Sequence, residues 1–326
     1  MTRPGLPISR RRFIAVAAAV AGSAHLSRSN AFAPPQIGWR GIALGAPATL
    51  TLHHPNEREA KEAIGACLAE LARLEAIFSL HRPDSALVRL NDHGRLDDAP
   101  PDLLRLLAEA LALAERTKGA FDPTIQPVWL WRAQNIGREL TPQDREDFAS
   151  IRKLVGWQDV HISGAGIGLA RPGMALTLNG IAQGYITDKV GDVLRALGFT
   201  NVLVDMGEQL ALGPKWDGAA WRIGLRDPSG ARTVMETMDL RQGAVSTSSN
   251  FTTGGEAQPM PHILEPWTGQ AAERWASVTV VSERATFADG LSTALSVLPV
   301  ERWREFTNSQ VRIYAVPLNA SRGFWV

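Results

Sequence analysis

The sequence predicts an α+β fold: a single compact domain with a largely antiparallel sheet and packed helices. Strand-like segments follow one another in runs, whereas helical segments stand in separate blocks, and this order favours α+β over alternating α/β architecture. No linker, repeat or low-complexity stretch divides residues 34–326. The chain has 326 residues, of which 45% are hydrophobic, and this is ample for one large buried core.

The first 33 residues are expected to be an export signal rather than part of the fold. Three arginines, Arg10 to Arg12, precede Phe13 and an Ala/Val-rich stretch. A basic region before a short apolar stretch is typical of a secretory signal, and the wording SRRRFI fits the twin-arginine type. The apolar stretch is too short to span a membrane comfortably. We therefore expect residues 34–326 to be periplasmic, or membrane-associated if the signal stays uncleaved.

Helices are predicted where apolar residues recur at helical spacing between start and stop residues. In the first helix, Cys67, Leu71 and Leu74 share one face, and glycines at 119 and 198 end the second and fourth helices. Helices are expected at residues 57–79, 100–122, 141–155, 181–199 and 287–299, with a short one at 300–308.

Strands are predicted where β-favouring residues alternate between turn residues. They are expected at residues 41–55, 159–163, 170–179, 201–213, 220–229, 232–249, 276–282 and 310–317. The glycine-rich residues 164–170 lie between two of these strands. They lack the spacing and the strand-loop-helix context of a dinucleotide loop, so we interpret them as a hairpin turn.

Charge and cysteine content exclude some classes of protein. The formal net charge of +1 offers no electrostatic argument for nucleic-acid binding, and we expect no nucleic-acid partner. The single cysteine, Cys67, excludes an internal disulfide and a cysteine-rich metal site. Its place on an amphipathic helix predicts a buried structural thiol.

Asp289 and Thr293 stand four residues apart in the helical segment 287–299, among apolar neighbours. Residues at this spacing share one helix face, so a carboxylate and a hydroxyl oxygen are offered to one point. Hard cations such as Mg²⁺ prefer such oxygen ligands. The alternative is an aspartate bonded to a backbone amide and a threonine bonded to its own helix. The two residues taken alone favour that alternative.

Other polar residues have roles that their own segments leave open. Ser248 lies in a hydroxyl-rich run, which fits ligand contact and a capped turn about equally. His262 lies in a proline-flanked loop, where function is more common, although a lone histidine is more often structural. Asp122 directly follows a helix and Asp205 ends a strand, and each fits a turn residue.

Seven segments, taken in their order and spacing, resemble the FAD:protein FMN transferases, the ApbE-type flavin transferase family. The resemblance runs from about residue 42 to residue 317. The wording NGIAQGY is similar to that of exported members associated with nitrous oxide respiration. The segments are FSLHRPDSALVRLND, TKGAFDPTIQPVWLW, LTLNGIAQGYITDKV, NVLVDMGEQLALG, AVSTSSN, HILEPWTG and SVTVVSERATFADGLSTALSVL.

The resemblance implies a fold, an activity and a partner. The fold is one α+β unit of tunnelling-fold-like character. The activity is Mg²⁺-dependent cleavage of FAD at its pyrophosphate, with FMN attached to a serine or threonine of a partner protein through a phosphoester bond and AMP released. The implied partner is an acceptor flavoprotein of a membrane or periplasmic electron-transfer system. Two rivals stay open: an FAD pyrophosphatase, and a non-catalytic flavin-binding carrier or maturation factor.

The resemblance also implies roles for individual residues. Asp289, Thr293 and the backbone carbonyl of Gly180 match metal ligands. His262 matches a histidine that acts as a base, and Asp289 is a candidate for a second catalytic role. Positions that match the FAD-binding site are Leu44, Ala120, Phe121, Asp122, Thr177, Gln183, Ser248, His262 and Ile263.

Three residues depart from the pattern of the family. Thr177 stands where an acid is usual, and Gln183 stands where lysine or glutamate is usual. Both departures put the details of FAD contact in doubt, while the metal-binding helix keeps its pattern. Glu208 stands where a second glycine is usual. It either supplies a charge near the site or is a surface residue, and the sequence favours neither role.

Overall fold

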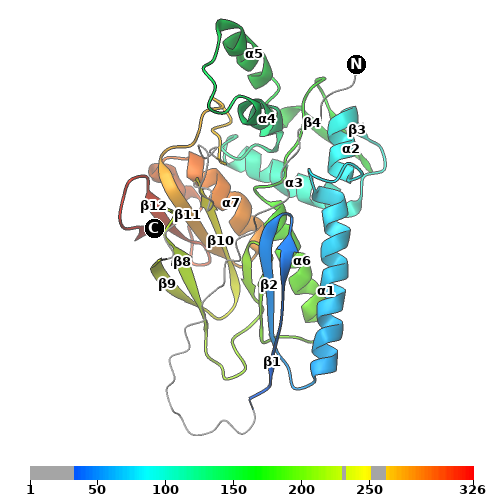
Figure 1. Ribbon diagram of the computed structural model, residues 1–326, viewed down its shortest axis with the longest axis vertical. Coiled ribbons are helices and arrows are strands. Elements are labelled where there is room, and N and C mark those ends of the chain that lie inside the picture. The colour runs from blue at the N-terminus through cyan, green and yellow to red at the C-terminus, as the bar shows by residue number, and fades with distance from the viewer. Residues whose placement is uncertain (1–32, 230–232, 251–261) are drawn as a thin grey trace. The chain divides into compact units, whose positions relative to one another are not determined.

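An antiparallel sheet of eight strands forms the centre of the fold (Figure 1). The computed structural model describes residues 33–229, 233–250 and 262–326. The expected export signal therefore lies, apart from its last residue, outside the described residues. In spatial order the strands are β1 (Gln36–Ala43), β2 (Ala46–His53), β6 (Val202–Asp205), β7 (Gln209–Ala211), β10 (Gly243–Ser249), β11 (Trp275–Ser282), β12 (Arg312–Pro317) and β13 (Phe324–Trp325).

Two smaller sheets flank this one. The first has three strands in the order β3 (Arg95–Leu96), β5 (Gly166–Leu169) and β4 (Val160–Ser163). The second is a hairpin of β8 (Trp221–Arg226) and β9 (Val234–Leu240). Every pairing in all three sheets is antiparallel, which confirms the predicted class of sheet.

The helices pack mainly on one face of the large sheet. Helix α7 contacts β10, β11 and α6, and α6 in turn contacts α1 (Figure 1). Residues 34–326 form one compact unit. The helices are α1 (Glu57–Phe78), α2 (Ala86–His93), α3 (Pro101–Arg116), α4 (Gln126–Gln134), α5 (Pro142–Arg152), α6 (Ala182–Ala196) and α7 (Ala285–Val297). Short 3₁₀ helices occupy Pro123–Ile125, Trp157–Asp159 and Val300–Glu305.

Strand β11 is buried along its whole length because protein covers both of its faces. Val278 and Val280 point into the core shared with the helices. Val281 points the other way, into a second cluster that contains Trp221 and Ile223 of the β8–β9 hairpin. Each fully buried side chain of this size contributes roughly 1.5–3 kcal/mol to stability. The strand is therefore a rigid support for α7, which lies directly on it.

The predicted helices are confirmed within a few residues of their ends, except that α3 ends at Arg116 and not at residue 122. Thr141 begins α5 with a reciprocal capping box to Asp144, and Gly119, after α3, has a φ of 81°. Cys67 is fully buried in α1, and burial raises the pKa of its thiol to about 12, as a structural cysteine requires. The short helix expected at 300–308 is a 3₁₀ helix over Val300–Glu305. Helices α2 and α4 were not predicted.

Several predicted strands were wrong in extent. Residues 41–55 form a hairpin, because Leu44 and Gly45 adopt φ values of 46° and 86° and reverse the chain. The spans 201–213 and 232–249 are likewise divided, the first at Gly207 with a φ of 101°. The hairpin around 164–170 is real, but its second strand is β5 at 166–169, so no strand spans 170–179.

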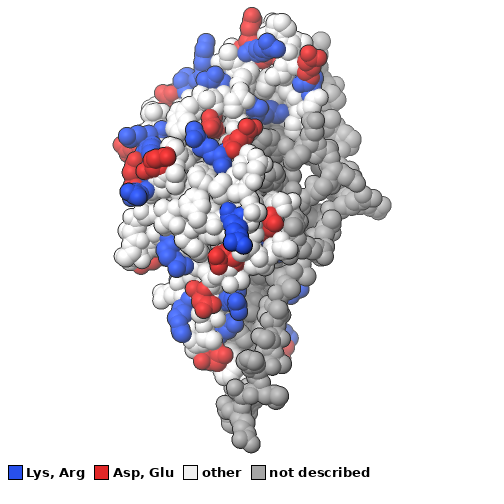
Figure 2. Space-filling model, turned by 90° about the vertical axis from the view of Figure 1, so that its left-hand side faces the viewer, with Lys and Arg blue, Asp and Glu red and all other residues white. Residues whose placement is uncertain are grey.

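The described residues contain no helix that is both long enough and apolar enough to cross a membrane. On the face shown in Figure 2, basic and acidic side chains lie interspersed among uncharged ones. Neighbouring opposite charges of this kind fit the near-zero net charge of the sequence.

Candidate active site

Helices α6 and α7 approach each other unusually closely at Gly184. A Cβ atom placed on Gly184 would lie 2.3 Å from the carbonyl oxygen of Ala285 and 2.8 Å from Cβ of Asp289. Real Cβ atoms do not make such contacts with backbone, so only glycine fits at this position. The backbone N–H of Gly184 donates to Oδ2 of Asp289 over 2.9 Å. The close approach thus brings Asp289 to the first turn of α6.

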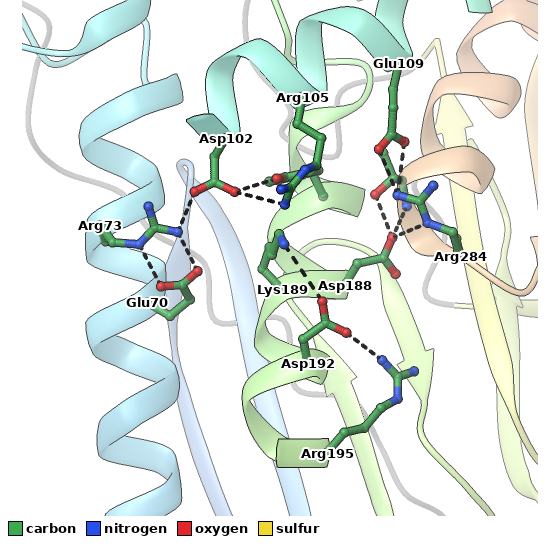
Figure 3. Close-up of polar contacts among 12 residues, drawn as sticks. Glu70, Arg73, Asp102, Arg105, Glu109, Asp188, Lys189, Asp192, Arg195 and Arg284 are labelled. Atoms are coloured by element: carbon green, nitrogen blue, oxygen red, sulfur yellow. Dashed lines mark hydrogen bonds and ion pairs between the residues drawn. The ribbon is translucent and has the colours of Figure 1, made fainter. Parts of the chain in front are cut away.

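Asp188 of α6 caps α7 from outside that helix. Its Oδ1 accepts from the backbone N–H of Ala285 at 2.8 Å, and its Oδ2 accepts from the N–H and the hydroxyl of Thr286 at 2.9 and 2.6 Å. Arg284, the residue that precedes α7, supplies no side-chain cap. Figure 3 shows Arg284 between Asp188 and Glu109 of α3, at 3.7 and 3.0 Å. Asp188 therefore fixes the start of α7 against α6.

A hydrogen bond and an ion pair connect α6 to α3 and α1. The hydroxyl of Tyr185 donates to Oδ1 of Asp102 over 2.6 Å. The other oxygen of Asp102 pairs with Arg73 of α1 at 2.7 Å (Figure 3). These contacts and the cap by Asp188 fix α6, whose first turn forms part of the site.

Replacing Asp188 with alanine is expected to lower the free energy of unfolding by about 2 kcal/mol, because two backbone N–H groups at the start of α7 lose their acceptor. Urea denaturation measures the change. Asp192→Ala is the matched control: Asp192 lies on the same helix and its side chain is 58% exposed, so its loss should cost under about 0.5 kcal/mol. Equal losses for the two variants would contradict the capping role.

A cavity of about 340 Å³ opens where these elements meet. Every residue predicted from the sequence for the site lines it, with the exception of Leu44. Leu44 lies in the β1–β2 turn, where its N–H donates to Oε1 of Glu75 over 2.7 Å. The lining comes from residues 120–123, Ile125, Gln126, Trp129, Thr177, Asn179, Gly180, Gln183, Glu208, residues 247–249, residues 262–264, Pro266, Asp289 and Thr293.

One corner of the cavity gathers oxygen atoms from three segments. The hydroxyl of Thr293 lies 3.4 Å from the carbonyl oxygen of Gly180 and 3.2 Å from the hydroxyl of Ser248. Ser248 also lies 2.7 Å from the hydroxyl of Ser292. A Cβ atom on Gly180 would stand 2.9 Å from the Thr293 hydroxyl and would fill this corner. Glycine at 180 therefore keeps the space beside Thr293 and Asp289 open.

The oxygen-lined corner fits a hard divalent cation. Asp289 is only 4% exposed, and among the described residues its Oδ1 accepts no hydrogen bond while Oδ2 accepts that of Gly184. A carboxylate, a hydroxyl and a carbonyl are the ligand types that Mg²⁺ takes, with water and phosphate completing the shell. No group of three or more His, Cys, Asp or Glu side chains in the described part of the chain is placed to hold a metal. A cation at this corner would thus depend on mixed oxygen ligands.

The cavity is lined by acidic side chains, and their pKa values are raised. Burial raises the pKa of Asp289 to about 7. The pKa of Glu208 is raised well above its ordinary value, first by burial and then by the charge of Asp289. Asp122 is the third carboxylate of the lining, and burial raises its pKa as well. None of the described lining residues is a lysine or an arginine.

Asp122 is a capping residue as well as a wall of the cavity. Its Oδ1 accepts from the N–H and hydroxyl of Thr124 at 2.8 and 2.6 Å, and its Oδ2 accepts from the N–H of Trp157 at 3.2 Å. The interpretation of Asp122 as a turn-capping residue is confirmed, and its contact with FAD stays a prediction. Because its carboxylate is occupied by these bonds, Asp122 shapes the wall formed with Ala120 and Phe121.

The residues that depart from the family pattern also line the cavity. The hydroxyl of Thr177 accepts from the N–H of Asn179 at 3.2 Å, while its own N–H donates to the carbonyl of Pro123 at 2.8 Å. Gln183 lies against the backbone turn at Gly207, where an added Cβ would meet its side-chain nitrogen at 2.6 Å. Both side chains thus support local backbone on the cavity wall.

His262 and Ile263 line the cavity beside a loop that two arginines hold. Burial lowers the pKa of His262, although part of the residue remains exposed. Arg132 of α4 donates to the carbonyl of Gly269, and Arg152 of α5 donates to that of Trp267 over 2.7 Å. A lowered pKa keeps the ring neutral near pH 7, which is the form that accepts a proton.

One wall of the cavity was not predicted from the sequence. Gln126 and Trp129 of α4 line it, and so does Asn179. Pro127 lies in the first turn of α4, where its missing N–H costs no helical hydrogen bond. The proline at this position, followed by apolar residues, was the available indication of this helix.

Comparisons with known proteins identify the family of this chain. The model of the ApbE family matches residues 44–316. A FAD:protein FMN transferase of Vibrio cholerae serotype O1 is 33% identical over 234 residues, covering 69% of this chain and 70% of the relative. One from Treponema pallidum is 34% identical over 257 residues, covering 71% and 70%.

Solved structures show the same fold. The ApbE protein of Thermotoga maritima superposes with a TM-score of 0.76 at 28% identity, over 87% of this chain and 94% of that one. The apo flavinyl transferase ApbE of Pseudomonas stutzeri superposes with a TM-score of 0.76 at 28% identity, over 91% and 96%.

Fold and site together define a transferase of the flavin-transferase class. The chain belongs to the ApbE family.

Proposed function

We propose that this protein transfers FMN from FAD to a serine or threonine of an acceptor protein. The reaction requires a divalent cation as cofactor, and Mg²⁺ is the cation that we propose. The observation that supports this most directly is the charge of the cavity. Asp122, Glu208 and Asp289 line it, and no described lining residue is cationic. An anionic pyrophosphate would be repelled by such a wall, so a cation at the oxygen-lined corner is needed to offset the charge.

Asp289, Thr293 and the Gly180 carbonyl would hold the cation. When bound there, the cation would neutralise charge on the pyrophosphate as the phosphoryl group moves. The apolar side chains of Phe121, Trp129 and Ile263 on the cavity wall would hold the flat rings of FAD. Walls of this kind would orient FAD with its pyrophosphate toward α7.

His262 would serve as the general base of the reaction. The acceptor hydroxyl oxygen attacks the phosphorus of the FMN half, forming one P–O bond. The P–O bond to the AMP phosphate breaks, and AMP leaves with its electron pair. A ring nitrogen of His262 takes the hydroxyl proton, and its lowered pKa keeps that nitrogen available.

The test is to incubate the purified protein with FAD, Mg²⁺ and a candidate acceptor flavoprotein, and to look for covalent flavin fluorescence in a denaturing gel. We expect a fluorescent acceptor band and stoichiometric AMP, both abolished by EDTA. FMN and AMP formed without acceptor, and no labelled acceptor, would instead show an FAD pyrophosphatase. Tight flavin binding with no AMP would show a carrier.

We further propose that residues 1–33 direct export and that the acceptor belongs to a membrane or periplasmic electron-transfer system. The support is the SRRRFI wording, with its arginine pair at Arg10 and Arg11. Cell fractionation tests this. Replacing both arginines with lysine should retain the protein in the cytoplasm, and unchanged export would argue against a twin-arginine signal.

A further inference from the structure

Glu208 is held inside the cavity by backbone on both sides of it. It lies in the turn between β6 and β7 and is only 8% exposed. Its Oε2 accepts from the N–H of Thr247 in β10 at 3.3 Å. Its carbonyl accepts from the hydroxyl of Thr187 in α6 at 3.2 Å and from the N–H of Met206 at 3.1 Å. The side chain therefore belongs to the cavity wall rather than to the surface.

Turn formation does not explain a glutamate at this position. The turn is stabilised by Asp205. Its Oδ1 accepts from the backbone N–H of Gly207 at 3.1 Å, and its Oδ2 accepts from the side-chain amide of Gln209 at 3.3 Å. The bond that Glu208 accepts from the N–H of Thr247 needs an acceptor but no charge, and glutamine would supply it. A carboxylate buried in this way is costly without a partner.

The charges around Glu208 indicate what that partner is. Asp289 is the charge with the largest effect on it, and that charge is of the same sign. Both carboxylates line the cavity together with Thr293, and none of the lining residues that the structure describes is cationic. A divalent cation bound beside two buried carboxylates would offset the charges of both.

We propose that Glu208 is a further carboxylate of the divalent-cation site, which strengthens cation binding at Asp289 and Thr293. It acts directly on the cation or through a water bound to it, and both arrangements place its negative charge toward the cation. The inference rests on the proposed function, because it assumes a cation at Asp289. Supporting groups of this kind typically contribute about 10–100-fold to metal affinity.

The experiment measures Mn²⁺ binding to the purified full-length protein without FAD, through the electron paramagnetic resonance signal of free Mn²⁺. Glu208→Gln is expected to raise the dissociation constant for Mn²⁺ about tenfold, which means weaker binding. Glu208→Ala should weaken it at least as much, which guards against an effect particular to glutamine. Glu273→Gln removes the same charge from an exposed position and should bind Mn²⁺ as the unmodified protein does.

A thermal melt without metal separates this role from a structural one. Because Glu208→Gln replaces a buried carboxyl group with a neutral side chain of nearly the same shape and keeps an acceptor for Thr247, its melting temperature should not fall. Mn²⁺ should then raise the melting temperature of the variant less than that of the unmodified protein.

Equal Mn²⁺ affinity for Glu208→Gln, Glu208→Ala and the unmodified protein would overturn the inference. In that case the unmodified protein would still label its acceptor, and the proposed function would stand. Absence of saturable Mn²⁺ binding by the unmodified protein would overturn this inference too. Acceptor labelling that persists in EDTA would show separately that the cation part of the proposed function had failed.

Discussion

Asp289→Asn is expected to lower the rate of FMN transfer by at least about a thousandfold, because the proposed cation site would lose the carboxylate that Asp289 supplies. Asparagine has nearly the same shape as aspartate, and its side-chain oxygen can still accept from the N–H of Gly184. The rate of acceptor labelling at saturating FAD and Mg²⁺ measures the effect.

The same variant should keep its fold. Asp289 is 4% exposed, and burial raises its pKa to about 7, so the ionised form is the costly one in the metal-free protein. Removing that charge should leave the melting temperature without metal unchanged or higher. A lowered melting temperature together with lost activity would point to misfolding and would not support a role as a metal ligand.

Gly184→Ala is expected to lower the free energy of unfolding by about 3 kcal/mol and to weaken cation binding as well. The added Cβ would lie 2.3 Å from a backbone oxygen of α7, and backbone cannot move aside as a flexible side chain would. Overpacking of this kind typically costs about 1–3 kcal/mol and occasionally more. The two helices must then separate, which moves Asp289 away from the first turn of α6. Urea denaturation and Mn²⁺ binding measure the two effects.

Gly65→Ala is the matched control for this prediction. Gly65 lies exposed in the middle of α1, and a Cβ placed there meets no atom within 4 Å. The same substitution should therefore stabilise the protein by about 0.5–1 kcal/mol, since alanine is the better helix former. A similar loss for both variants would mean that the contact of α6 with α7 is not special.

Helices were predicted well because their evidence is local. The spacing of Cys67, Leu71 and Leu74 and the cap at Thr141 are all contained within one segment. Strand extents were predicted less well, since a single unusual residue divides a strand. Leu44 has a φ of 46°, which is rare for leucine, and it converts one predicted strand into a hairpin. Nothing in the alternating pattern of that segment marks this turn.

The sequence by itself determined the family, the α+β class and a set of site residues that, apart from Leu44, all line the cavity, because these depend on residue types and their spacing. It left open whether Asp289 and Thr293 are structural, and what Glu208 does. The tertiary structure decided where these residues lie. Close packing at Gly184 brings α6 to α7, the Gly180 carbonyl then meets Thr293, and the β6–β7 turn places Glu208 on the same wall. These contacts join positions up to 113 residues apart, and periodicity within a segment carries no information about such distances.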